Sequence, residues 1–241
     1  MTDEDRWYFL HNGFYRVPQL LPEELIGRLN ASTDNQIEQK LEPIVWEPAK
    51  VGESIVRRLS KILERDPVYM EAATHPFVLD ALEGVLGPNI ELITNKHNHL
   101  MVRPGDSSVV PWHSGEEPWD VRLITVLIYL QESTTENGCV RIVPGSHLRP
   151  FQHPRRPKYE NFHDNPFFNQ SVPVPMPRGG VLLFNDSCFH GADVNQTDRS
   201  RRSMTLAYQT HDVHDIRKDE PEKILVRGKR EYVGHPYEEH G

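Results

Sequence analysis

Residues 181–191 read VLLFNDSCFHG, which predicts a buried strand that ends in a histidine and a glycine. A second segment, residues 111–116 (PWHSGE), follows a predicted strand and the turn residues 103–105, and it places His113 at another strand end. Two histidines so far apart in the chain, His113 and His190, can meet only if the sheet folds over on itself, as in a jelly roll. Imidazoles suit iron, zinc, copper or nickel, so the pair by itself does not select the metal.

Short apolar or β-branched runs, separated by Pro, Gly and Asn, recur through the middle and later parts of the chain, a spacing typical of a barrel or sandwich. The predicted strands are residues 90–94, 97–103, 122–130, 140–143, 172–174, 181–184 and 204–208. We therefore predict a mainly β fold with flanking helices, a double-stranded β-helix of the jelly-roll or cupin-like type.

The front of the chain has helical patterning instead. Apolar residues recur at helix spacing in residues 22–29, 55–63 and 77–86. The length suits one domain. Its predicted parts are a helical front segment at 1–88, a jelly-roll core at 89–209 and a C-terminal tail at 210–241, in which 224–226 and 232–233 could add a strand. Residues 146–169 lack a clear period and predict a long loop that serves as a lid or contacts substrate.

Composition narrows the classes of function. The formal net charge of −8 is spread along the chain, which argues against a nucleic-acid polymer as partner. No apolar run approaches the roughly 18 residues of a membrane-spanning helix, and the first residues are acidic where a signal peptide is basic. We expect a soluble, cytoplasmic protein without membrane association. Cys139 and Cys188 are expected to be buried free thiols, with one disulfide left open as the alternative.

A series of short motifs runs through the chain in a particular order. The motifs are residues 9–14, 20–25, 103–105 before Trp112-His113, 136–139 leading to 143–147, 184–186 before His190-Gly191, and then Asn195 and 198–202. Each motif is weak alone, but their order and spacing together resemble the phytanoyl-CoA dioxygenase family of Fe(II)/2-oxoglutarate oxygenases over about residues 9–208. The resemblance implies the jelly-roll fold, with Fe(II), 2-oxoglutarate and O₂ as cofactors.

The resemblance also implies roles for single residues. His113 and His190 would be the iron ligands, and Arg201 would pair in bidentate fashion with the distal carboxylate of 2-oxoglutarate, because its planar fork matches a carboxylate. Alternation along the last strand would turn Arg201 inward and Arg202 outward. The candidates for further contacts with 2-oxoglutarate are His99 and Thr125.

One position departs from the usual His-x-Asp or His-x-Glu metal motif of the family. Here the third residue is Gly115, which supplies no ligand. In the iron halogenases that resemble this family, Gly or Ala stands at this position and chloride takes the vacated iron site. The resemblance therefore implies chloride beside Gly115 and chlorination of an unactivated C–H bond. The predicted catalytic set is His113, Gly115 and His190.

Two other interpretations stay open. Gly115 could be a turn residue, with Glu116 or Glu117 reaching the iron through irregular backbone, which would give a hydroxylase or desaturase. On an unbroken strand, however, residue 116 points away from the face shared by 113 and 115. The chain could also be a non-catalytic jelly-roll binding module, since fold does not fix function; the intact region around Arg201 argues against that.

The substrate is predicted to be a free-standing small molecule of specialised metabolism, such as antibiotic biosynthesis, with a nucleotide as first choice and a carrier-protein thioester as the alternative. Basic residues of the 146–169 loop could bind a phosphate or carboxylate, and aromatic residues could stack on a base, although a solvated basic loop has the same pattern. The candidate substrate contacts are Trp112, Glu116, Trp119, Arg155 and Arg156.

Overall fold

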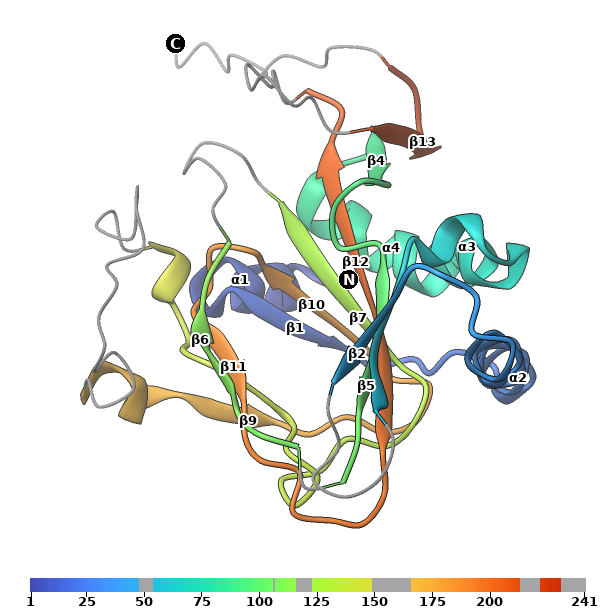
Figure 1. Ribbon diagram of the computed structural model, residues 1–241. Helices are drawn as coiled ribbons and strands as arrows, with labels where there is room; N and C mark the ends of the chain where they lie inside the picture. The colour runs from blue at the N-terminus through green and yellow to red at the C-terminus, as the bar shows by residue number, and fades with distance from the viewer. Residues whose placement is uncertain (48–53, 106, 116–122, 149–165, 213–221, 231–241) are drawn as a thin grey trace, which may run out of the picture.

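Two antiparallel sheets face each other in the computed structural model, and helices cover the outer side of the larger sheet (Figure 1). The structure describes residues 1–47, 54–105, 107–115, 123–148, 166–212 and 222–230. The large sheet has nine strands in the order β1-β10-β7-β12-β5-β3-β2, with β4 beside β12 and β13 beside β4. The small sheet has the order β6-β11-β8-β9. This is the arrangement of the predicted jelly roll.

Most of the predicted strands are present, with bounds shifted by a few residues. The large sheet consists of β1 (Phe14–Val17), β2 (Ile44–Glu47), β3 (Ile55–Ser60), β4 (Ile90–Ile93), β5 (His99–Arg103), β7 (Ile124–Tyr129), β10 (Val181–Asn185), β12 (Arg201–Thr210) and β13 (Lys223–Arg227). The small sheet consists of β6 (Val110–His113), β8 (Val140–Ile142), β9 (Val172–Val174) and β11 (His190–Ala192). The tail residues expected to add a strand therefore form β13 in part, while 232–233 lie outside the described residues.

Strand alternation divides the core into two layers. On β7, Val126 and Ile128 point outward into the main apolar cluster under the helices, whereas Leu127 and Tyr129 point inward. The inner cluster also contains Ile142 of β8, so it joins the two sheets. The inner faces of β5, β7, β10 and β12 thus look toward the small sheet, where the two histidines lie.

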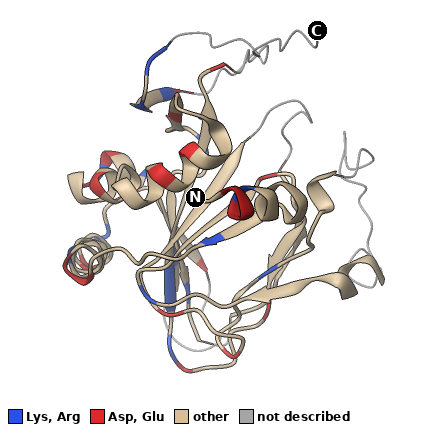
Figure 2. Ribbon diagram, turned by 180° about the vertical axis from the view of Figure 1, so that it is seen from behind, with Lys and Arg blue, Asp and Glu red and all other residues tan. Residues whose placement is uncertain are grey.

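Four helices lie among the described residues: α1 (Asp3–Asn12), α2 (Glu23–Glu38), α3 (Pro67–Ala73) and α4 (Pro76–Leu86). Figure 2 shows acidic residues, drawn red on the ribbon, in these helices. Local sequence fixes their starts, because Asp66 caps α3 and Pro67 and Pro76 occupy first-turn positions. Arg202 of β12 forms a 2.7 Å ion pair with Asp34 of α2, so it faces the helices. No helix in the described ranges is long and apolar enough to cross a membrane.

The prediction of a helix at 55–63 is wrong. Those residues form β3 and a short 3₁₀ turn, Ile62–Glu64. The register of β3 against β2 is irregular: Arg58 pairs with Val45 and Val56 with Trp46, so Arg57 is an extra residue. The bulge places Val56 and Leu59, three positions apart, in the same apolar cluster, which imitates helical spacing. The front segment is therefore not purely helical, since β1, β2 and β3 belong to the large sheet.

Both cysteines are buried and free, as expected. Cys188 lies against Gly13, the residue that ends α1 with a φ of 81°, and its thiol donates to the Gly13 carbonyl at 3.4 Å. A Cβ at residue 13 would overlap with Cys188 and His147. Glycine is required at residue 13 for two reasons: the backbone is left-handed, and there is no room for a Cβ. The contact packs the end of α1 and the start of β1 against the loop that leads to His190.

Candidate active site

The two predicted metal ligands are direct neighbours in the small sheet. His113 at the end of β6 is paired in register with His190 at the start of β11, and their ring centroids lie 4.1 Å apart. The fold-over predicted from the two motifs therefore brings together residues from distant parts of the chain.

Backbone carbonyls fix the orientation of both rings. Nδ1 of His113 lies 2.8 Å from the carbonyl of Pro111, and Nδ1 of His190 lies 2.9 Å from that of Cys188. A proton on Nδ1 leaves Nε2 as the nitrogen that can ligate a metal, which is the usual arrangement of metal-binding histidines. Burial, and then the nearby His113, lower the pKa of His190 to about 3, so its ring is neutral as metal binding requires.

Gly115 lies against a carboxylate from another segment. Its N–H donates to the carbonyl of Asp186 at 2.7 Å, and a Cβ at residue 115 would overlap with Oδ2 of Asp186. The backbone of Gly115 is not in the left-handed region, so glycine is needed here for space. The volume that a side chain at 115 would enter is thus already occupied by the carboxylate of Asp186.

Asp186 is only 3% exposed, and two side chains hold its Oδ1. The Thr125 hydroxyl donates to it at 2.9 Å, and Nε2 of His97 lies 3.4 Å away. Burial alone would raise the pKa of Asp186, but the hydrogen bond and charge of His97, with smaller contributions from His190 and Thr125, hold it below the ordinary value. Asp186 is therefore an anionic carboxylate beside the histidine pair, and Thr125 supports it.

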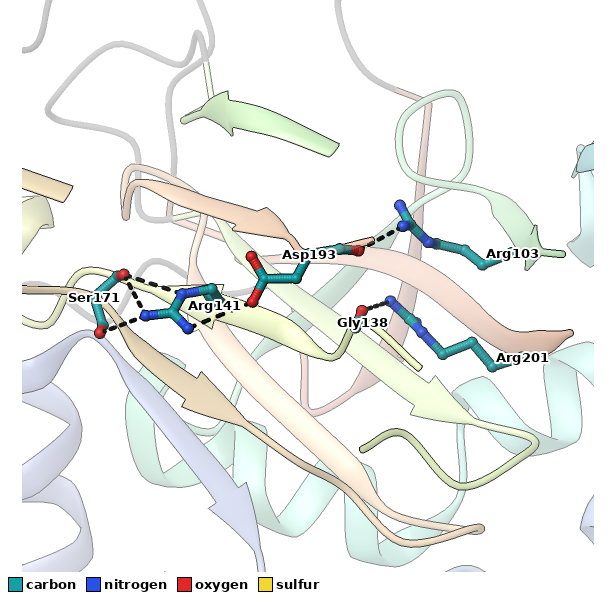
Figure 3. Close-up of polar contacts among 6 residues, drawn as sticks. All are labelled: Arg103, Gly138, Arg141, Ser171, Asp193 and Arg201. Carbon is teal, nitrogen blue, oxygen red and sulfur yellow. Dashed lines mark hydrogen bonds and ion pairs between the residues drawn. The ribbon is translucent and has the colours of Figure 1, made fainter. Parts of the chain in front are cut away.

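Two buried arginines lie deeper between the sheets. Arg201 of β12 and Arg103 of β5 are cross-strand partners, 4% and 3% exposed, and Figure 3 shows them side by side, reaching toward the small sheet. Arg201 donates from Nε to the Asn137 carbonyl at 3.0 Å and from Nη2 to that of Gly138. Arg103 donates from Nη2 to the carbonyls of Ser108 and Asp193 at 2.9 and 2.8 Å. Both are held by backbone oxygens.

Neither arginine forms an ion pair with a carboxylate in the part of the chain that the structure describes, although the charges of Glu47 and Asp193 act on Arg103 from farther away. Nε and Nη1 of Arg103 and the hydroxyl of Tyr129 are buried there without a hydrogen-bond partner. Burial, and then the charge of Arg201, lower the pKa of Arg103 to about 9. Two adjacent buried cations and an unsatisfied hydroxyl form a site for a carboxylate, since such donors are costly to leave unpaired. This donor set fits the distal carboxylate of 2-oxoglutarate, and the imidazole pair fits Fe(II).

The geometry changes the expected role of Arg201. The fork edge formed by Nε and Nη2 is used by backbone carbonyls, so the predicted bidentate pairing through that edge is not available in this conformation. Arg103 offers Nε and Nη1 instead. The carboxylate site therefore consists of two arginines. Arg103 was not predicted as a site residue from the sequence.

His99 of β5 supplies a testable property of the site. Burial, and then the charges of His97 and Arg58, lower its pKa to about 3. Because the unfolded chain binds this proton near pH 6.5 and the folded chain does not, His99 should reduce stability as the pH falls below 6.5, by about 1.4 kcal/mol per pH unit. We expect the free energy of unfolding of the metal-free chain, measured in urea between pH 7 and 5, to fall less steeply in His99→Gln. Equal slopes for His99→Gln, wild type and the exposed control His11→Gln would contradict this.

Other predicted contacts are not brought to the site. Trp112 stacks on Phe168 with centroids 4.8 Å apart and an interplanar angle of 13°, and it lies against Gly191. Since His113 and His190 face inward, their neighbours Trp112 and Gly191 face the opposite side of the small sheet. Trp112 thus lies on the opposite face of the small sheet from the two histidine rings, and its contact with substrate stays a prediction. The remaining candidates, Glu116, Trp119, Arg155 and Arg156, lie outside the described residues.

A model of the phytanoyl-CoA dioxygenase family matches residues 9–203, which is most of the chain. The chain belongs to the phytanoyl-CoA dioxygenase family. This membership places it among the Fe(II)/2-oxoglutarate-dependent oxygenases and confirms the resemblance seen in its motifs.

Relatives in this family are distant in sequence. The chain is 23% identical to the peroxisomal phytanoyl-CoA dioxygenase of Homo sapiens, over 97% of this chain and 75% of that protein. It is 21% identical to a probable phytanoyl-CoA dioxygenase of Caenorhabditis elegans, over 88% of this chain and 77% of that protein.

Solved structures share the fold. One is the non-heme alpha ketoglutarate dependent epimerase SnoN from nogalamycin biosynthesis, with a TM-score of 0.75 at 18% identity over 94% of this chain and 98% of that one. Another is EctD from S. alaskensis with bound Fe, with a TM-score of 0.71 at 22% identity over 88% of this chain and 77% of that one. These neighbours confirm the predicted jelly-roll fold class.

Proposed function

We propose that the chain hydroxylates an unactivated C–H bond of a small molecule, using Fe(II), 2-oxoglutarate and O₂. Family membership supports the cofactors, and one observation supports hydroxylation: the anionic carboxylate of Asp186 fills the space beside Gly115 that chloride would need. A second anion in the same volume would meet direct charge repulsion at short range.

The residues of the chain have distinct tasks in this proposal. His113 and His190 would hold the iron through Nε2, and Arg103, Arg201 and Tyr129 would orient the distal carboxylate of 2-oxoglutarate. When bound, iron and 2-oxoglutarate would activate O₂ for its reaction with the C–H bond. Phe184 packs against the His190 ring with centroids 4.7 Å apart, and such apolar neighbours exclude water from the reacting groups.

Product analysis tests the reaction class. Candidate small molecules are incubated aerobically with the protein, Fe(II) and 2-oxoglutarate in chloride and then in bromide, and analysed by mass spectrometry with succinate as a second readout. We expect a product that gains one oxygen atom in both salts. Succinate release without any substrate-dependent increase over the whole panel would count against the proposal, and no succinate at all would favour a binding module.

Chlorination remains the second candidate, and Gly115 is the observation that favours it, since residue 115 contributes no ligand. In this case the product would carry the isotope pattern of chlorine in chloride and of bromine in bromide. Such a product from the wild-type chain would replace hydroxylation as the reaction.

A nucleotide is the first substrate to test. The proposal of a nucleotide substrate depends on the basic and aromatic residues of 149–165, which lie outside the described residues. It also assumes that the substrate is a free-standing small molecule. Nucleoside monophosphates should be compared with the matching nucleosides, because a phosphate-binding role for Arg155 and Arg156 predicts turnover of the former only.

A further inference from the structure

The usual iron site of this family takes one anionic ligand from the protein, and residue 115 does not provide it. Two neutral imidazoles leave the metal without an anionic protein ligand, whereas the usual facial set contains two histidines and one carboxylate. The segment after His113 continues into residues that the structure does not describe. Among described residues, the carboxylate beside the histidine pair is that of Asp186, four positions before His190.

We propose that Asp186 supplies the carboxylate ligand of the iron site, in place of the residue that the His-x-Gly motif lacks. This rests on the proposed function, because it assumes that His113 and His190 hold iron. Its basis is positional: Oδ2 of Asp186 lies where the side chain of residue 115 would begin, which is the position from which the usual carboxylate side chain would extend.

The contacts of Asp186 leave the right oxygen for this role. Thr125 and His97 both contact Oδ1, so Oδ2 is the oxygen turned toward Gly115. The hydrogen bond from the Gly115 N–H to the Asp186 carbonyl ties the two segments together at 2.7 Å. Ligating carboxylates commonly keep a hydrogen bond on the second oxygen, as Thr125 provides here.

Binding of iron by Asp186 requires a rearrangement. No group of three His, Cys, Asp or Glu side chains in the described ranges is close enough together to hold a metal. Asp186 must therefore move toward the imidazoles when iron binds. A side chain at residue 115 would overlap with the Asp186 carboxylate, so glycine at this position has a function other than chloride binding: it leaves room for that carboxylate.

The test compares Fe(II) affinity, measured anaerobically by calorimetry, in four variants and the wild type. Asp186→Asn keeps the shape but removes the charge, and we expect at least about 10-fold weaker binding, since even loss of an outer partner of a metal ligand costs 10–100-fold. The double variant Gly115→Asp/Asp186→Ala moves the carboxylate to the usual family position and should recover most of the affinity. Asp193→Asn, a more exposed carboxylate that pairs with Arg141, and Glu116→Gln should bind as the wild type does.

Wild-type affinity in Asp186→Asn would overturn the inference, and so would lost iron in Glu116→Gln, which would make Glu116 the ligand. If the variants do not fold, as judged by circular dichroism, chloride titration of the visible band of the wild-type Fe(II)–2-oxoglutarate complex decides. We expect no change, and a chloride-dependent shift would overturn the inference. Failure of the wild type to bind Fe(II) and 2-oxoglutarate would instead refute the proposed function itself.

Discussion

Replacing His190 with alanine is expected to abolish turnover and to weaken Fe(II) binding by at least about 100-fold, because loss of a direct ligand exceeds the 10–100-fold cost of losing an outer partner. His190 is half-buried, its Nδ1 lies 2.9 Å from the Cys188 carbonyl, and its ring lies against His113. The measurements are anaerobic Fe(II) calorimetry and succinate release with 2-oxoglutarate.

A matched control for this variant is His75→Ala. His75 caps α4 on the far side of the large sheet, where its Nδ1 accepts from the Phe77 N–H at 3.3 Å. Its loss should reduce stability by roughly 1 kcal/mol, the cost of a lost helix cap, and leave iron affinity unchanged. Undiminished iron binding in His190→Ala, with the fold intact, would show that the metal lies elsewhere.

Replacing Arg103 with methionine is expected to weaken 2-oxoglutarate binding by about 2–4 kcal/mol, or ~30- to ~1000-fold, because one partner of a buried charge pair is removed. The effect on the empty protein should be much smaller. Arg103 loses two hydrogen bonds to carbonyls, but the variant also relieves the repulsion from Arg201 and removes two unpartnered nitrogens. Without 2-oxoglutarate, Arg103→Met should therefore melt at nearly the wild-type temperature. Adding 2-oxoglutarate should raise the melting temperature of the wild type but not that of the variant.

Arg201→Met should behave in the same way, and Arg141→Met should not. Arg141 lies on the outer face of the small sheet, bonded to Ser171 and to the carboxylate of Asp193, so its charge is compensated (Figure 3). If Arg103→Met retained the wild-type thermal shift with 2-oxoglutarate, the carboxylate site would consist of Arg201 alone.

Much of the fold could be predicted because alternation and turn residues are local signals. The strand that carries Thr125 and the later part of β12 were identified this way, whereas His190 begins a separate short strand, β11, in the small sheet. The failure at 55–63 has a specific cause, since a bulge at Arg57 gives β3 the apolar spacing of a helix. Whether residues 55–63 form a strand depends on pairing with β2 and β5, which the local pattern does not contain.

The site was predicted where a motif carries it and missed where only tertiary contacts do. His113, His190 and Arg201 are in recognisable motifs. The importance of Asp186 arises from its contact with Gly115, and that of Tyr129 and Arg103 from being buried without partners, which only the folded chain reveals. Arg103-Pro-Gly and Asn-Asp186 were visible as motif residues, but their spacing gives no sign of where the side chains point.

Anaerobic addition of Fe(II) and then 2-oxoglutarate to the wild-type chain, followed by visible absorption, shows whether His113 and His190 hold iron that binds 2-oxoglutarate. We expect a weak charge-transfer band that saturates at one equivalent of each and is absent in His190→Ala. A wild-type chain that binds iron but develops no band with 2-oxoglutarate, or an unchanged band in His190→Ala, would contradict it.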